Sequence, residues 1–189
     1  MENKMALLET PICDFGEKII DFKLQSVNNS FISLNDIKGK NGTLVMFLCN
    51  HCPYVKAIIE KLVITTRKLD EFGINSIAIM PNDVENYPED SFDEMKKFSS
   101  SNNFNFHYLY DETQKVSKLF GAVCTPDFFG YNKNDELQYR GRIAKMKDLK
   151  FVNDENDLLD AMIKISKTNN GPVNQYPSAG CSIKWKINE

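Results

Sequence analysis

Two cysteines stand three positions apart in the run Cys49-Asn50-His51-Cys52-Pro53. Two thiols at this spacing can close a small disulfide. The run follows an unbroken apolar segment, Thr43 to Leu48, which is typical of a strand buried on both faces. Pro53 has no N–H and is harmless only in a first helical turn, so a helix is predicted to begin there. Because a helix N-terminus favours a thiolate, the pattern predicts a redox dithiol.

The order of the two cysteines predicts their roles. Cys49 comes first, at the junction between strand and helix, and is the candidate attacking thiolate. Cys52 lies one turn into the helix, should be more buried, and would resolve a mixed disulfide by attacking Cys49. A protonated His51 between them would stabilise the thiolate and make the pair more oxidising. The alternative is two buried thiols that act only as small hydrophobic side chains.

The hydrophobic pattern predicts the elements that position this dithiol. Residues 19–24 alternate and, with the return at 31–34, predict a hairpin. Strands that then alternate with helices and close with an antiparallel pair predict an α/β sandwich with a mixed sheet. The dithiol lies at the carboxyl end of a strand, where open α/β sheets place their sites. Strands are expected at 43–48, 74–80, 106–110, 127–131 and 136–139, and helices at 53–72, from 88, from 111 and around 158–163.

Composition excludes several classes of function. The 189 residues, 42% of them hydrophobic, suffice for the core of one domain. A net charge of −3 gives no basic field for nucleic acid. No run approaches the roughly 20 apolar residues of a membrane span, and the first residues lack the apolar core of a signal peptide. We therefore expect a cytoplasmic protein with no nucleic-acid or membrane partner. Five cysteines, an odd number, argue against a structural disulfide framework.

The segment Phe47–Val55 resembles a branch of the thioredoxin-like redoxins, the AhpC/TSA and thioredoxin superfamily. The resemblance spans nearly the whole chain. It implies a thioredoxin-like three-layer α/β/α sandwich over residues 1–170, with an N-terminal hairpin extension at about 19–34. An irregular tail over residues 171–189 would pack on this domain. The other segments that carry the resemblance are Tyr87–Ser91, Tyr108–Gln114, Cys124–Phe129, Tyr139–Arg142 and Pro177–Trp185.

The resemblance also implies a substrate site. Pro126 would be a cis-proline that faces the dithiol, beside an extended edge for a substrate peptide. Thr125 and Pro126, together with Asn50 and His51, are the predicted substrate-binding residues. The implied function is a thiol–disulfide oxidoreductase without a cofactor. It would act on a disulfide-containing protein, a small thiol or a peroxide, and would exchange electrons with an unidentified donor.

Two departures from thioredoxins leave the direction of electron transfer open. Thioredoxins have a tryptophan before the first cysteine and Gly-Pro between the pair, whereas this chain has Leu48 and Asn50-His51. They also carry a buried carboxylate six residues before the first cysteine, where this chain has Thr43. Such a carboxylate assists removal of the proton from the second thiol. Because residue 43 is a threonine, the chain lacks this carboxylate, which argues against efficient general reduction of disulfides.

A thiol peroxidase is the alternative enzyme. Peroxiredoxins place Thr or Ser three residues before a peroxidatic cysteine that is followed by Pro. Cys52-Pro53 matches the second half of this pattern, but Cys49 stands where the hydroxyl is expected. Arg140 or Arg142 could supply a guanidinium to a peroxide. An equal interpretation of each arginine is that it belongs to a solvated pair near the end of a strand.

The remaining cysteines offer further alternatives. Cys124 lies two residues before Pro126 and could approach the dithiol, as an alternative disulfide partner or as a zinc ligand with Cys49, Cys52 and His51. We expect no bound metal, because C-x-x-C zinc sites usually come with a second close pair. A member of the fold that only binds metal or a partner is thus a third hypothesis. The fifth thiol, Cys13, is expected to be inert, and Cys181 is either a distant resolving cysteine or, as we favour, part of a structural tail.

Overall fold

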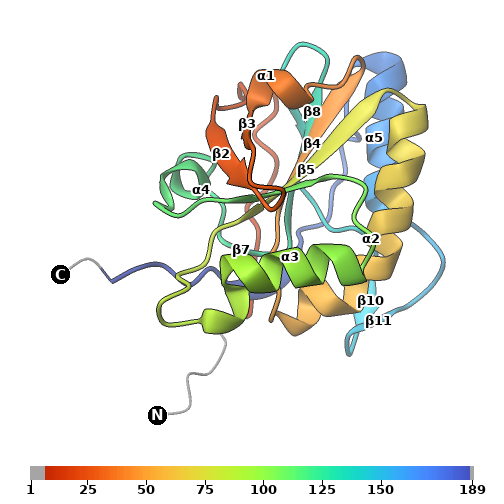
Figure 1. Cartoon of the computed structure of the whole chain (residues 1–189). Coiled ribbons are helices and arrows are strands. Elements are labelled where there is room, and N and C mark those ends of the chain that lie inside the picture. The colour runs from red at the N-terminus through yellow and green to blue at the C-terminus, as the bar shows by residue number, and fades with distance from the viewer. Residues whose placement is uncertain (1–6, 188–189) are drawn as a thin grey trace.

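A seven-stranded mixed sheet, in the order β3-β2-β6-β5-β4-β8-β9, forms the centre of the computed structural model (Figure 1). The model describes residues 7–187, so the predicted ends of the domain and the tail, 1–6 and 188–189, lie outside the described residues. The three middle strands are parallel, and the outer pairs are antiparallel. These strands are β2 (Lys23–Ser26), β3 (Phe31–Ser33), β4 (Gly42–Phe47), β5 (Ile74–Met80), β6 (His107–Tyr110), β8 (Asp127–Asn132) and β9 (Leu137–Tyr139).

Helices cover both faces of this sheet and confirm the thioredoxin-like three-layer sandwich. Methionine, leucine and isoleucine side chains of α2, α3 and α5 form one core against the sheet. A second core on the opposite face includes Leu34 and Ile37 of α1 and Phe120 at the end of α4. In Figure 1, α2 and α5 run side by side on one flank. The helices are α1 (Leu34–Ile37), α2 (Pro53–Glu71), the 3₁₀ turn η1 (Pro88–Asp90), α3 (Phe92–Ser101), α4 (Lys115–Leu119) and α5 (Asp157–Thr168).

Strand β4 is buried along its whole length, as its apolar sequence predicted. Leu44 and Met46 point into the core beneath α2, while Val45 and Phe47 point into the opposite core. This is the period-2 alternation of a strand, used here with apolar residues on both faces. The chain leaves β4 and enters α2 through the cysteine run, so the fold fixes the dithiol at the carboxyl end of the sheet.

The N-terminal hairpin is present but begins later than the alternation suggested. Strand β2 starts at Lys23, and the preceding Ile19 and Ile20 pack against the core on the α1 side without forming a sheet strand. Strand β2 then pairs with both β3 and β6, so the hairpin extends the main sheet. A second small hairpin joins β10 (Met146–Lys147) to β11 (Lys150–Phe151).

The C-terminal tail contains a strand, contrary to the expectation of an irregular segment. Strand β12 (Ala179–Ser182) pairs antiparallel with β1 (Leu7–Glu9) on one side and with β7 (Cys124–Thr125) on the other. The tail sequence Ala-Gly-Cys-Ser is short and has no hydrophobic alternation, so its strand depends on partners distant in the chain. The result is a separate three-stranded sheet beside the dithiol.

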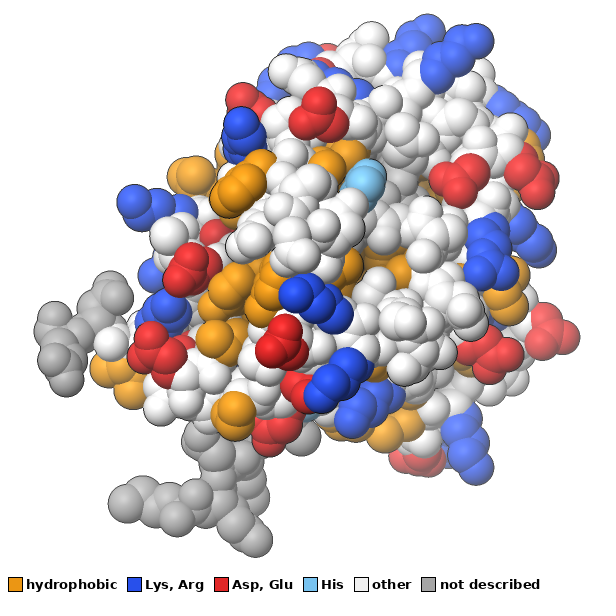
Figure 2. Space-filling view, viewed as in Figure 1, with side chains coloured by type: hydrophobic (Ala, Val, Ile, Leu, Met, Phe, Trp, Pro, Cys, Tyr) orange, Lys and Arg blue, Asp and Glu red, His pale blue; other side chains and the backbone are white. Residues whose placement is uncertain are grey.

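The surface agrees with the charge balance of the sequence. On the face shown in Figure 2, Lys and Arg side chains are interspersed with Asp and Glu. Among residues 7–187, no helix is both long enough and apolar enough to span a membrane.

Two arginines at the end of β9 each pair with an aspartate. Arg140 contacts Asp127 at 3.0 Å, and both side chains are almost fully buried, at 9% and 0% exposure. Arg142 contacts Asp157 at 2.6 Å, and about a quarter of each side chain is exposed. The first pair is therefore desolvated, whereas water screens the second.

Replacing Asp127 with Ala should lower the free energy of unfolding by about 3–5 kcal/mol, because the buried Arg140 loses its counter-ion. Replacing Asp157 with Ala is the matched control and should cost less than about 1 kcal/mol. Urea denaturation of the two variants at neutral pH measures both losses. Equal losses would contradict this assignment of the buried pair.

Candidate active site

The dithiol lies at the N-terminus of α2, with Cys52 as the residue that caps the helix. The first helical hydrogen bond runs from the Lys56 N–H to the Cys52 carbonyl, at 3.0 Å. Both Cys49 and Cys52 are fully buried, at 0% exposure. The expected difference in burial is therefore absent: the first cysteine is as enclosed as the second.

Thr125 contacts both sulfurs of the dithiol. Its hydroxyl lies 3.2 Å from Cys49 Sγ, and its carbonyl oxygen lies 3.2 Å from Cys52 Sγ. The Thr125–Pro126 bond is cis, as the resemblance implied. The loop between β7 and β8 thus faces the dithiol through the residue before the proline.

A third sulfur completes the cluster. Cys181 of β12 lies with its Sγ 2.9 Å from Cys52 Sγ, although 129 positions separate the two residues in the chain. All five cysteines of the chain are thiols in this structure. The sequence named Cys181 and favoured a structural role for it, whereas the fold brings it into contact with the dithiol.

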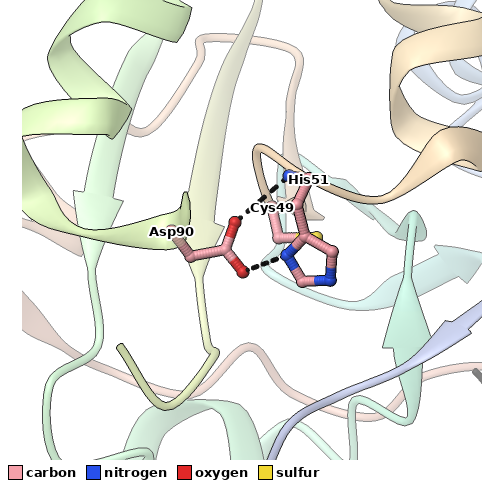
Figure 3. Close-up of side chains that lie close together, drawn as sticks. All are labelled: Cys49, His51 and Asp90. Atoms are coloured by element: carbon pink, nitrogen blue, oxygen red, sulfur yellow. Dashed lines mark hydrogen bonds and ion pairs between the residues drawn. The ribbon is translucent and has the colours of Figure 1, made fainter. Parts of the chain in front are cut away.

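A buried aspartate holds the loop between the two cysteines (Figure 3). Asp90 is fully buried, and its Oδ1 accepts hydrogen bonds from the backbone N–H groups of Asn50 and His51, at 2.8 and 3.2 Å. Its Oδ2 lies 2.6 Å from His51 Nδ1 and accepts a 2.7 Å bond from the Asn82 amide. Four contacts therefore use both oxygens, as a buried carboxylate requires.

His51 is held from two sides. Hydrogen bonding to Asp90 raises the pKa of His51 above its ordinary value, and this outweighs the opposite effect of burial. The imidazole also stacks on Tyr87, with ring centroids 5.9 Å apart. On the inner side of the loop, the Asn50 amide oxygen accepts a 3.0 Å bond from the buried Tyr108 hydroxyl. Each residue between the cysteines thus has a fixed side chain.

The surroundings of the sulfurs in this cluster shift the pKa values of their thiols in different directions. Hydrogen bonds from Cys181 and then from Cys49 lower the pKa of Cys52, and the Val55 N–H at the start of α2 adds to this. Burial, followed by the hydrogen bond to Cys52, raises the pKa of Cys49 well above its ordinary value. Burial opposes a charge on Cys52, but these hydrogen bonds outweigh it. These shifts favour a charge on Cys52 over a charge on Cys49, whereas the sequence predicted the attacking thiolate at Cys49.

Three of the predicted auxiliary residues point elsewhere. Cys124 is buried with its Sγ 3.6 Å from the Pro126 carbonyl, because alternate residues of β7 face opposite sides and Thr125 takes the side of the dithiol. Burial raises the pKa of the Cys124 thiol. Arg140 binds Asp127 and the Gly121 carbonyl, and Arg142 binds Asp157. Neither guanidinium is directed at the dithiol in these contacts.

The zinc set considered from sequence is not the group that the fold assembles. Ligand atoms of Cys49, His51 and Asp90 lie within 4.8 Å of one another, and Cys124 is not among them. Both oxygens of Asp90 already accept hydrogen bonds from the protein. An ion bound there would have to displace the bond between His51 and Asp90, so these two side chains are organised as a hydrogen-bonded pair.

Sequence reasoning missed Asp90, Asn82 and Tyr108 as parts of the site. Asp90 is in the segment Tyr87–Ser91, which carries part of the family resemblance, and that was the available signal. Tyr108 begins another of these segments, Tyr108–Gln114, whereas nothing in the sequence around Asn82 indicated a contact with the cysteine loop.

Replacing Asp90 with Asn should lower the pKa of His51, because the imidazolium loses the carboxylate that favours its charged form. Since the pKa of His51 is raised in the folded state, its contribution to stability is present below about pH 6.5 and is lost as the pH rises through the folded-state value. In the Asp90→Asn variant, this pH-dependent loss of stability should be smaller. NMR titration of the His51 ring protons measures the pKa.

Asp93→Asn is the control for that titration, because Asp93 is an exposed aspartate in the first turn of α3. It should leave the His51 titration as in the unmodified protein. An Asp90→Asn variant with an unchanged His51 titration would contradict the assigned pair.

Comparisons with known proteins agree with this fold. The model of the AhpC/TSA family matches residues 15–143, which is more than half of the chain. Among curated proteins, none matches. An uncharacterized conserved protein from Geobacillus kaustophilus is 35% identical, with a TM-score of 0.92 and coverage of 98% of this chain and 99% of the other.

Two further solved structures are similar. A hypothetical protein from Sinorhizobium meliloti 1021 is 30% identical, with a TM-score of 0.87 over 95% of this chain and 98% of the other. A secreted disulfide oxidoreductase from Mycobacterium tuberculosis is 17% identical, with a TM-score of 0.55 over 67% and 87%, which shows a shared fold alone. The fold, the dithiol at the start of α2 and the family match lead to one conclusion: the chain belongs to the AhpC/TSA family of thioredoxin-like redoxins.

Proposed function

We propose that this protein is a thiol–disulfide oxidoreductase with Cys49 and Cys52 as its redox pair. Thr125 is the observation that carries the proposal, because its hydroxyl and its carbonyl each lie 3.2 Å from one of the two sulfurs. A hydroxyl at that distance can donate a hydrogen bond to a Cys49 thiolate. The same residue belongs to the backbone edge on which a substrate peptide would lie.

In the reducing direction, the proton of Cys49 passes to the Cys52 thiolate through the hydrogen bond between them. The Cys49 sulfur then attacks a substrate disulfide, whose S–S bond breaks as a mixed disulfide forms. The departing substrate thiolate takes the proton from Cys52. Cys52 attacks Cys49, which closes the Cys49–Cys52 disulfide and releases the second substrate thiolate. Two electrons reach the substrate, and an electron donor must return them.

The loop between the cysteines would support this exchange. The charged His51 offsets the negative charge of Asp90 beside Cys49, which would otherwise repel a thiolate there. Asn50, fixed by Tyr108 and by the Glu89 carbonyl, keeps the loop in the shape that presents both sulfurs to Thr125. We propose disulfide-containing proteins or small disulfides as substrates.

The reduced protein should accelerate insulin reduction by dithiothreitol, and Cys49→Ser should return the rate to the uncatalysed one, because the attacking sulfur is lost. Turbidity of the precipitating insulin B chain measures the rate. Cys13→Ser is the matched control, since Cys13 lies on the opposite face of the sheet from the dithiol and should keep full activity. Equal rates for the Cys49→Ser variant and the unmodified protein would refute the proposal.

A thiol peroxidase is the second candidate, and the lowered pKa of Cys52 favours it. A thiolate at a helix N-terminus can attack a peroxide and become a sulfenic acid. The Cys49 thiol would then condense with this sulfenic acid, which forms a disulfide and releases water. Arg140 is committed to Asp127, so the guanidinium that would assist this reaction is engaged elsewhere.

Stopped-flow measurement of hydrogen peroxide consumption decides between the two candidates. Because the site offers a peroxide few directed donors, we expect a rate constant close to that of free cysteine. A much faster rate that disappears in Cys52→Ser would instead establish the peroxidase.

A further inference from the structure

The tail of the chain occupies the edge where a substrate peptide would bind. Strand β12 pairs with β7 in a register that sets Cys181 opposite Thr125 and Ser182 opposite Cys124. The Ser178 hydroxyl donates a 2.8 Å hydrogen bond to the Pro126 carbonyl. This edge is the backbone beside the cis-proline, so the protein presents its own extended segment to its own dithiol.

Close approach of the two strands depends on Gly180. A Cβ at this position would lie 2.2 Å from the Thr125 carbonyl oxygen and 2.6 Å from the carbonyl carbon. Any other residue would force β12 away from β7. The glycine next to Cys181 therefore allows the tail to reach the depth at which its sulfur meets Cys52.

The tail is anchored beyond β12 as well. The Lys184 N–H donates to the Asn82 side chain at 2.9 Å, and the same Asn82 donates to Asp90. Gln114 binds the Lys184 carbonyl at 2.8 Å and the Lys186 N–H at 2.8 Å. These contacts connect the tail to the network that shapes the cysteine loop.

We propose that Cys181 is a third redox thiol, which forms a disulfide with Cys52 and so fixes β12 across the substrate edge at Thr125. The proposal rests on the proposed dithiol function, because the exchange starts from the Cys49–Cys52 disulfide. Its basis is the 2.9 Å contact between the two sulfurs and the strand register that holds it.

The exchange is internal and needs no outside oxidant. The Cys181 thiol gives up its proton, and its sulfur attacks Cys52 in the Cys49–Cys52 disulfide. The Cys52–Cys181 bond forms, the Cys49–Cys52 bond breaks, and Cys49 leaves as a thiolate that takes the proton. The number of disulfides is unchanged. The disulfide is thus transferred from Cys49 to Cys181 of the tail. Cys49 is again a thiol, and β12 is held covalently beside Thr125.

This arrangement separates two states of the site. With Cys52 bonded to Cys181, the backbone edge of Thr125 is held by β12, and a protein substrate has no strand to pair with. Reduction of that bond leaves β12 attached by non-covalent contacts alone, so the tail can be displaced by a substrate segment. The tail then competes with the substrate for the edge of Thr125, and how firmly it binds there depends on the redox state of Cys181.

The test is disulfide mapping of the oxidised full-length protein. Cys49→Ser is oxidised with diamide, alkylated, digested with trypsin and analysed without reduction. We expect most of the monomer to contain a link between the tryptic peptides 41–56 and 168–184, which carry Cys52 and Cys181. Adding Cys181→Ser should abolish this link, whereas adding Cys124→Ser should leave it.

Two other products would overturn the proposal. A link from Cys52 to peptide 119–133 would give the role to Cys124, and a Cys49→Ser monomer that stays reduced would show that Cys181 does not react. The Cys181→Ser single variant separates this failure from that of the proposed function. If it fails to form the Cys49–Cys52 disulfide, the dithiol function itself is wrong.

A second variant tests the register without removing a sulfur. Gly180→Ala should push β12 from Thr125, lower the yield of the Cys52–Cys181 link in the Cys49→Ser background, and raise the alkylation rate of the reduced dithiol. Ser182→Ala on the same strand is the control and should change neither, because its hydroxyl only accepts a 3.3 Å bond from Lys184. Unchanged values for Gly180→Ala would contradict the role of β12.

Discussion

The buried carboxylate of Asp90 is the constraint on which the site depends. A carboxylate without solvent must have its oxygens filled by donors, and this one draws its four from the cysteine loop and from Asn82. The loop residues Asn50 and His51 donate to it in a conformation that turns both sulfurs toward Thr125. Asn82 also accepts a hydrogen bond from the Lys184 N–H, which connects Asp90 to the tail. One desolvated charge thus ties together three segments that are far apart in the chain.

Strand alternation decides which thiol joins the dithiol. On β7, Thr125 faces the sulfurs, so the adjacent Cys124 must point away from them. On β12, the antiparallel register sets Cys181 opposite Thr125, and its sulfur reaches Cys52. A one-residue shift of β12 would replace this sulfur with Gly180 or Ser182. The identity of the third cysteine is therefore a consequence of pairing and not of proximity along the chain.

The acid of the site also comes from an unexpected direction. Thr43 occupies the strand position at which thioredoxins have a carboxylate, and here its hydroxyl accepts a 3.2 Å bond from the Gly39 N–H. The negative charge near Cys49 is instead supplied by Asp90, from the turn before α3, and His51 is hydrogen-bonded to it. The electrostatics of the dithiol thus depend on the residues between the cysteines, where Asn-His replaces the Gly-Pro of thioredoxins.

The sequence alone determined the sandwich, the strand β4 with apolar residues on both faces, and a dithiol at the start of α2, because these depend on local periodicity and on Pro53. It also indicated Thr125-Pro126 through family resemblance. It could not determine the contact of Asp90 with His51 or the place of Cys181, since contacts over 39 and 129 positions leave no local pattern. The short strand β12 has no alternation of its own and exists only because β1 and β7 flank it. Tertiary structure alone decided that contact, because only strand register can place a thiol from the tail against Cys52.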